Sequence, residues 1–211
     1  MLLLPILANS QEFVYQLILK NMNKYSYYYW GPVLFKTKIS NEDKEKILKL
    51  KTMKSIQHKL AGVIEKEHSL SSPKFFKIIE KYLPYFYDCY KHWYSRKPPG
   101  KLKSHRTWIN RMGPGDFNPV HTHLNCDFSS VVFLKIDKKL KEENNSYVGL
   151  SQGPGSLNFL YGNQATDCIS EAHFFPNEGD FYIFPKNLYH FVQPYKADAE
   201  RISVSSNFRW E

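Results

Sequence analysis

The stretch GDFYIFPKNLYHFVQPYKADAERISVSSNF, residues 179–208, decides the fold that this chain is expected to adopt. It contains three runs rich in aromatic and β-branched residues, at 180–184, 190–193 and 201–208, and each is bounded by turn-forming residues. Short runs of this kind are typical of β-strands. The segments between them are too short for a helix that packs on a sheet, so this part of the chain is predicted to consist of consecutive strands.

The same pattern extends back to about residue 101. Eight strands are predicted, at 107–112, 119–123, 129–136, 156–161, 172–175, 180–184, 190–193 and 201–208. Turns rich in glycine, proline or asparagine separate several of them, as at 113–115 and 153–155. Eight short strands without intervening helices predict a jelly roll or double-stranded β-helix. The polar stretch 138–146 is predicted to be an exposed loop.

The first hundred residues have a different pattern, with apolar side chains at helical spacing. The predicted elements are helices at 10–24, directly after Ser40, at 56–67 and at 72–93, with a strand at 33–37. Pro84 is expected to kink the last helix. The aromatic stripe of that helix is expected to pack in the core against a sheet.

The two patterns meet at the Pro- and Gly-containing segment 96–100. The expected division is a helical region, 1–100, which packs on the barrel and does not fold independently, and a double-stranded β-helix catalytic core, 101–211. The predicted fold class is therefore mostly β with a helical N-terminal part (α+β).

The composition indicates a globular protein without a membrane span. The chain has 211 residues, of which 42% are hydrophobic and 16% aromatic, which suits one domain with an extension. Residues 1–8 are apolar but too short to span a membrane, and they lack the positive region of a signal peptide. Cys89, Cys126 and Cys168 stand far apart without a CxxC pair, which favours a reducing cytoplasm over a disulfide framework.

The chain is basic, with a formal net charge of +9 and a pI near 9.3. Such a charge would attract polyanionic partners. The lysines are nevertheless spread over predicted helices and loops, as on an ordinary solvated surface. Nucleic-acid binding is therefore a less favoured expectation, although it is left open.

Three histidines are expected at or near strand ends of the predicted barrel. His121 and His123 are two residues apart, and side chains at i and i+2 of a strand point to the same face. His190 follows a second turn-and-strand unit at 179–185. Neutral imidazole is a ligand for iron, zinc, copper and nickel. The three residues predict a metal site, with ordinary surface histidines as the alternative.

A candidate anion site lies one hairpin beyond His190. Arg201 and Ser203 share a face of the last strand by alternation. A guanidinium pairs with a carboxylate through two hydrogen bonds, and a serine hydroxyl can donate a further one. These residues predict a carboxylate-binding site beside the metal. The alternative is an Arg201 that faces solvent and pairs with Asp198 or Glu200.

These motifs together resemble those of the 2-oxoglutarate- and iron(II)-dependent oxygenases found in marine bacteria and their phages. The resemblance covers about 108–208 and is carried by residues 121–125, 129–134, 179–185, 188–190 and 200–208. It implies a double-stranded β-helix that holds iron(II) at an open site, with 2-oxoglutarate as cosubstrate and dioxygen as oxidant. Arg201 and Ser203 would hold the distal carboxylate, with Asn110 and Trp108 as weaker candidates for cosubstrate contact. A phage-encoded chain would work in the host cytoplasm.

One position departs from the family's pattern. Most such oxygenases use a His-x-Asp or His-x-Glu pair plus a distal histidine, whereas this chain has His123 in the place of the carboxylate. Three outcomes are open: a site of His121, His123 and His190; a site completed by Asp127; or a two-histidine site with water as the third ligand. The three-histidine site is favoured. Because it is neutral, it should attract the anionic cosubstrate more strongly than a carboxylate-containing triad.

The resemblance implies hydroxylation of a substrate, coupled to decarboxylation of 2-oxoglutarate to succinate and carbon dioxide. The substrate and the oligomeric state are left open. A peptidyl side chain such as proline, a nucleobase and a small metabolite are all candidates, and the basic charge slightly favours an acidic macromolecule.

Two other function classes remain open. The segments around His121 and His190 approximate a cupin signature, with Asp127 in the glutamate position, which would make the chain a metal-dependent enzyme or binding module that does not use 2-oxoglutarate. A cupin has no need of Arg201 and Ser203, so this pair discriminates between the two. A non-enzymatic nucleic-acid-binding or virion-associated protein is the third class.

Overall fold

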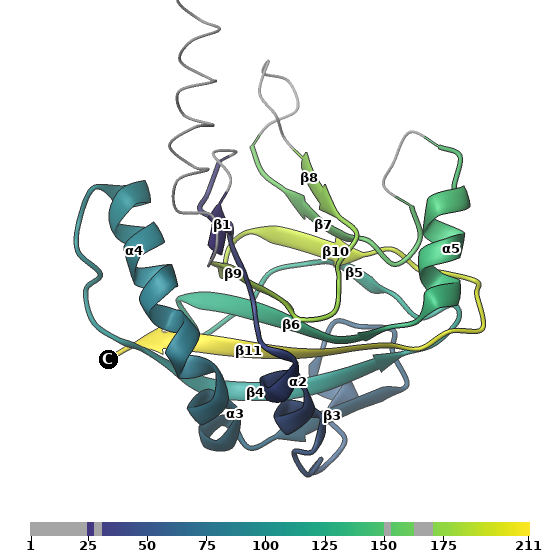
Figure 1. Cartoon of the computed structure of the whole chain (residues 1–211), viewed down its shortest axis with the longest axis horizontal. Helices are drawn as coiled ribbons and strands as arrows, with labels where there is room; N and C mark the ends of the chain where they lie inside the picture. The colour runs from purple at the N-terminus through teal and green to yellow at the C-terminus, as the bar shows by residue number, and fades with distance from the viewer. Residues whose placement is uncertain (1–24, 28–30, 150–152, 163–170) are drawn as a thin grey trace, which may run out of the picture.

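Two antiparallel sheets face each other as the layers of a sandwich (Figure 1). The structure is a computed structural model and describes residues 25–27, 31–149, 153–162 and 171–211. The large sheet has the strand order β1 (Tyr25–Tyr27), β2 (Phe35–Lys38), β9 (Asp180–Pro185), β6 (Phe128–Ile136), β11 (Arg201–Trp210), β4 (Leu102–Met112), β3 (Lys66–Leu70). The small sheet has the order β5 (Asn118–His121), β10 (Tyr189–Val192), β7 (Leu157–Leu160), β8 (Glu171–Phe174).

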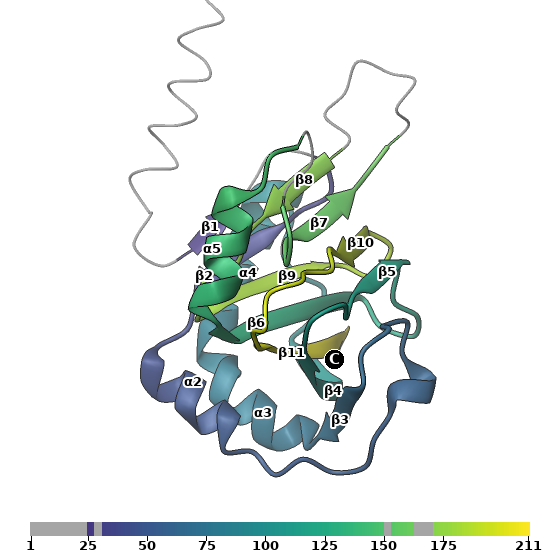
Figure 2. The ribbon, with the colours of Figure 1, turned by 90° about the vertical axis from the view of Figure 1, so that its right-hand side faces the viewer.

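The large sheet is covered on both faces (Figure 2). Helices α2 (Asn41–Leu48), α3 (Ser72–Ile79) and α4 (Leu83–Tyr94) pack on its outer face, and the small sheet covers its inner face. Strand β6 shows how one run of residues serves both cores, since side chains alternate between the faces of a strand. Val132 belongs to the outer core and Phe133 to the core between the sheets. This double burial explains why β6 lacks an apolar–polar alternation.

The predicted jelly-roll fold is confirmed, and each of the eight strands predicted beyond residue 100 is present. The helix predicted directly after Ser40 is also confirmed, as α2. The Ser40 Oγ caps it by accepting a hydrogen bond from the Asp43 N–H at 3.2 Å. The predicted helix at 72–93 is divided into α3 and α4 by the 3-10 turn η2 (Glu80–Tyr82). Pro84 lies in the first turn of α4, so it begins a helix rather than kinking one. Phe75 and Phe86 pack in the outer core, as expected.

The prediction of a helix at 56–67 is wrong. The segment contains the 3-10 turn η1 (Gln57–Lys59) and the beginning of β3, which pairs with β4 at the edge of the large sheet. Ile56 and Ile64 are buried, so their spacing reflects burial rather than a helical face. Pairing with a neighbouring strand here outweighs local periodicity.

The stretch 138–146, predicted to be a loop, forms helix α5 (Lys138–Ser146). The Asp137 carboxylate caps it by accepting a hydrogen bond from the Lys139 N–H at 2.9 Å. Leu140 is fully buried and is the only buried residue recorded for this helix. The polar sequence is thus the solvated face of a helix that one apolar side chain anchors.

Some predictions lie outside the described residues, namely the helix at 10–24 and the surroundings of Cys168. Cys89 and Cys126 are buried free thiols. None of the helices in the described ranges is long and apolar enough to cross a membrane. The division of the chain at residue 100 stays a prediction, although the pairing of β2 with β9 and of β3 with β4 joins both parts in one sheet.

Candidate metal centre

Neighbouring strands of the small sheet bring two of the histidines together. His121 ends β5 and is paired in register with His190 of β10, so the two side chains leave the sheet side by side. The prediction placed His123 within a strand at 119–123. In the structure β5 ends at His121, so His123 lies two residues beyond the strand. Its N–H donates to the Lys186 carbonyl at 2.9 Å, which fixes the turn that returns this side chain to the site. The rings of His190 and Phe184, on the large sheet, are 4.7 Å apart, so the histidines face the space between the sheets.

The ring nitrogens of the three histidines have the spacing of ligands to one ion. One nitrogen from each residue lies within 4.8 Å of the others. The Nε2 atoms of His123 and His190 are 3.1 Å apart. Two nitrogens bound at right angles, each about 2.1 Å from an ion, would be roughly 3.0 Å apart. The observed distance therefore leaves room for a shared metal between these two rings.

Backbone carbonyls fix the orientation of two rings. His121 Nδ1 is 2.7 Å from the Pro119 carbonyl oxygen, and His190 Nδ1 is 2.9 Å from that of Leu188. A carbonyl oxygen only accepts, so Nδ1 carries the hydrogen in both rings and Nε2 keeps its lone pair. This arrangement is common around metal-binding histidines, because the hydrogen bond from the non-ligating nitrogen fixes the tautomer and the orientation of the ring.

Burial keeps the three imidazoles neutral. It is the main cause that lowers the pKa of each, to about 3 for His123 and well below the ordinary value for His190. The neighbouring histidines lower the pKa values of His123 and His190 further. A metal ligand must be deprotonated, so these rings are ready to bind a cation at neutral pH.

Asp127, the alternative third ligand, is engaged elsewhere. Its Oδ2 accepts a hydrogen bond from the Trp210 N–H at 2.9 Å. Within the described part of the chain, the cluster with metal-ligand spacing contains His121, His123 and His190 and not Asp127. The geometry thus brings together the favoured triad.

Arg201 projects from the inner face of the large sheet into the core. Only 2% of the residue is exposed, and burial lowers the pKa of its guanidinium to about 10. Nη1 contacts the Met112 sulfur at 3.0 Å, and the guanidinium carbon lies 4.8 Å from the centre of the Phe133 ring. Sulfur is a weak acceptor, and the Arg201 Nε has no hydrogen-bond partner within the described ranges. Among the described residues, no carboxylate pairs with this buried cation.

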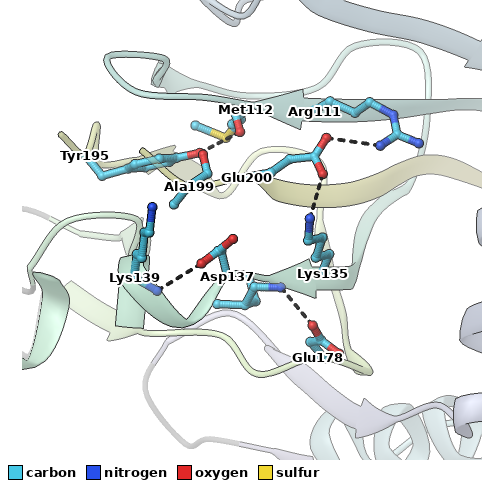
Figure 3. A network of polar contacts seen from close by, with 10 residues as sticks. Arg111, Met112, Lys135, Asp137, Lys139, Glu178, Tyr195, Ala199 and Glu200 are labelled. Carbon is cyan, nitrogen blue, oxygen red and sulfur yellow. Dashed lines mark hydrogen bonds and ion pairs between the residues drawn. The ribbon is translucent and has the colours of Figure 1, made fainter. Parts of the chain in front are cut away.

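The solvent-facing alternative for Arg201 is wrong. Figure 3 shows the Glu200 carboxylate between Arg111 and Lys135, at 3.2 and 3.0 Å. Asp198 lies 3.7 Å from Lys139 instead. The two acids proposed as surface partners therefore serve other cations, while Arg201 points away from them into the core.

A cavity between the sheets joins the predicted metal and anion sites. Its lining includes the three histidines together with Arg201, Ser203 and Asn110. Asn110 of β4 is in register with Ser203 of β11, so both side chains project from the same face of the sheet. Trp108, two residues before Asn110, lines this cavity as well. Residues that are remote in the sequence thus share one chamber.

Two residues of the site were not found from the sequence. Glu67 and Asn118 line the neighbouring outer cavity together with His121 and His123. Glu67 was assigned to a helix, and nothing in a lone glutamate signals burial in a strand. Asn118 is the residue before the predicted strand 119–123, and no role was predicted for it from the sequence. Only the pairing of β3 with β4 places Glu67 at the site.

Comparison with known protein families agrees with this geometry. Residues 106–207 match the family model described as "Putative 2OG-Fe(II) oxygenase". The matched range contains every histidine of the cluster and also Arg201, Ser203 and Asn110. No curated protein matches the chain.

Solved 2-oxoglutarate oxygenases have a similar fold. The viral collagen prolyl hydroxylase vCPH from Paramecium Bursaria Chlorella virus-1, in its 2-oxoglutarate complex, gives a TM-score of 0.52 at 15% identity, covering 84% of this chain and 96% of that one. A Pseudomonas putida prolyl-4-hydroxylase gives 0.51 at 13% identity, covering 92% and 98%. HygX from Streptomyces hygroscopicus, with nickel and 2-oxoglutarate bound, gives 0.50 at 10% identity, covering 83% and 82%. At these identities the likeness concerns the fold.

Proposed function

We propose that this protein is a 2-oxoglutarate- and iron(II)-dependent dioxygenase that hydroxylates a substrate while 2-oxoglutarate is converted to succinate and carbon dioxide. The observation that carries the proposal is the buried Arg201, which lacks a carboxylate partner among the described residues and shares a cavity with three neutral imidazoles. An unpaired buried charge costs several kcal/mol. A carboxylate ligand in this cavity would supply the missing partner.

The side chains present fit both groups. His121, His123 and His190 would hold iron through Nε2, with two of the rings fixed by backbone carbonyls. Arg201 and Ser203 would bind the distal carboxylate of 2-oxoglutarate, with Asn110 beside it on the same face. When bound, iron and 2-oxoglutarate together supply the activation of dioxygen, which no side chain of this chain can perform.

The protein's own part is to position the ligands and to exclude water. Phe159 and Phe184 lie against His190, with ring centres 6.0 and 4.7 Å away, and shield the ring from solvent. Substrate would enter through the outer cavity, which His121 and His123 also line. A peptidyl prolyl side chain is one candidate substrate, since two of the similar structures are prolyl hydroxylases. A reducing cytoplasm, bacterial or phage-infected, suits the buried free thiols of Cys89 and Cys126.

The test is anaerobic titration of the iron(II)-loaded protein with 2-oxoglutarate, followed by the visible metal-to-ligand charge-transfer band. We expect a saturable band in the wild type. In Arg201→Ala the half-saturating concentration should rise by roughly 30-fold or more, because loss of one partner of a buried charge pair typically costs about 2–5 kcal/mol. Arg209→Ala, an exposed arginine on the same strand, is the matched control and should titrate as the wild type does.

Three outcomes would overturn the proposal. Equal half-saturating concentrations of 2-oxoglutarate in the wild type and in Arg201→Ala would contradict the role proposed for Arg201. No band in any of these proteins, although each holds iron, would favour a cupin-type metalloprotein that does not use 2-oxoglutarate. Protein that holds no metal would favour the non-enzymatic alternative.

A further inference from the structure

The outer cavity lies where the sandwich is open at its edges. Strand β3 is the edge of the large sheet and β5 the edge of the small one, and each contributes residues to the lining. The cavity volume is about 360 Å³. Trp108, His121 and His123 line both this cavity and the inner one. A molecule bound here would therefore lie next to the proposed metal.

Glu67 is a buried acid in the wall of this cavity. Only 1% of the residue is exposed, and its Oε2 has no hydrogen-bond partner in the described part of the chain. Glu67 is in register with Asn110, so the two side chains share the inner face of the large sheet. Asn118 lines the same cavity, and its Oδ1 also lacks a hydrogen-bond partner among the described residues. Buried polar groups are nearly always paired in proteins, so two unpaired acceptors beside one cavity indicate a ligand that donates hydrogen bonds.

The cations near this cavity do not neutralise Glu67. Arg106 lies over the Trp108 ring, 5.5 Å from its centre, and one of its nitrogens is 3.4 Å from the Lys59 carbonyl oxygen. Lys59 is an exposed residue of the rim. No ion pair to Glu67 exists within the described residues, and the pKa of its carboxyl is raised by burial and then by the negative charge of Asp116. The acidic end of the cavity is therefore left without a positive charge.

We propose that Glu67 binds a cationic nitrogen of the substrate, either an ammonium or a guanidinium group. The inference rests on the proposed function, since it concerns the substrate of that same site. A guanidinium or ammonium ion offers only donors, which matches the unpaired oxygens of Glu67 and Asn118. It also gives the buried carboxylate the counter-charge that it lacks.

This inference differs from the expectation drawn from net charge. The formal charge of +9 slightly favoured an acidic macromolecule as partner. Exposed lysines act through solvent and salt, which screen them beyond roughly 10 Å. A buried acid within the cavity acts at contact distance, where screening is weak. The group that the cavity selects is thus set by Glu67 rather than by the surface charge.

The test uses butylguanidinium and its neutral isostere butylurea as probes of the metal-loaded protein. Guanidinium has no free lone pair to bind the metal, so a preference for butylguanidinium over butylurea cannot come from direct coordination. Binding is followed by NMR of the Glu67 side-chain carboxyl in protein labelled with ¹³C-glutamate. We expect a saturable shift with butylguanidinium and at least a tenfold weaker effect with butylurea. Glu67→Gln, followed by backbone amide shifts, should lose this preference, whereas Glu65→Gln, which removes an exposed acid two residues away, should keep it.

Equal binding of the two probes to the wild type would overturn the inference. The same holds for an unchanged preference in Glu67→Gln. The outcome is independent of the charge-transfer titration, because Glu67 is neither a metal ligand nor a cosubstrate contact in the proposal. A protein that forms the band but shows no guanidinium preference would keep the proposed function and lose this inference.

Discussion

Asp43 and Glu67 are both buried carboxyl groups next to the large sheet, one on the helical side and one on the side of the cavities. Asp43 is 1% exposed, like Glu67. It accepts hydrogen bonds from the hydroxyls of Ser40 and Tyr82 at 2.8 and 2.5 Å and lies 2.7 Å from the Lys81 ammonium. Burial alone would raise the pKa of Asp43, but these partners outweigh it and lower the pKa to about 2.

Glu67 has equal burial and the opposite result. Burial raises the pKa of its carboxyl, the negative charge of Asp116 raises it further, and the value reaches about 7. The two acids show that the helical side satisfies its polar groups internally, whereas the cavity side leaves them for a ligand. Natural proteins depart from full satisfaction mainly at functional sites. Polar residues of the cavity side should therefore affect ligand binding first, and those of the helical side should affect stability.

The largest effect that this comparison predicts is the loss of metal from His190→Gln. Glutamine has a similar volume but a poor ligand atom, so metal affinity should fall by at least about 100-fold, given that even outer-shell partners are worth 10–100-fold. The free energy of unfolding of the metal-free variant should stay within about 1 kcal/mol of the wild type. Metal content after dialysis and chemical unfolding of the apoprotein measure the two effects.

The control for this variant is His173→Gln. His173 lies on the same small sheet, where its ring nitrogens contact Asn158 and Glu171, outside the cluster. It should keep metal at the wild-type level. Retention of metal by His190→Gln would contradict the shared site, and a large loss of apoprotein stability would contradict the division between the two sides of the sheet.

A smaller effect is predicted for the pH dependence of stability at Glu67. Its pKa is raised in the folded protein, so the folded state binds this proton more tightly than the unfolded chain does. Proton binding at Glu67 therefore contributes to the free energy of unfolding. This contribution is fully present below about pH 4.5 and is lost as the pH rises through about 7, a decline of up to about 3 kcal/mol. Glu67→Gln should lack this decline and be the more stable protein at pH 8. Urea unfolding of apoprotein over this pH range measures the difference, with Glu65→Gln as the control.

The sequence was sufficient to predict the fold and the clustering of the three histidines, but not the wall of the outer cavity. His121 and His123 could be paired from their spacing, and the position of Arg201 in the last strand follows from alternation. The true course of the chain at His123 depends on a hydrogen bond to Lys186, which is remote in the sequence. Glu67 was missed because its strand exists only through pairing with β4. Local pattern thus indicates which side chains share a strand face, but not which strand becomes an edge beside a cavity.

On the helical side, Asp43→Asn should lower the free energy of unfolding by about 2 kcal/mol at pH 7. Because the pKa of Asp43 is lowered, its contribution is present above about pH 4 and is lost as the pH falls through about 2. The difference between wild type and variant should therefore shrink on acidification. Glu42→Gln is the control. This neighbouring acid is exposed and, among the residues described, its ion pair is with Lys46, so its loss should change stability far less. Metal content and cosubstrate affinity should not change in either variant.

The smallest effect is predicted for Asp127→Asn. An asparagine oxygen can still accept the hydrogen bond from the Trp210 N–H, so both stability and fold should be nearly retained. If His123 is the third ligand, metal affinity should stay within about twofold of the wild type, which corresponds to about 0.4 kcal/mol. His123→Gln should instead lose metal as His190→Gln does. The reverse pattern, with metal lost from Asp127→Asn and kept by His123→Gln, would assign the third position to the carboxylate and would mean that the turn after β5 rearranges when metal binds. Equal retention of metal in both variants would leave His121 and His190 as the protein ligands, with water in the third position.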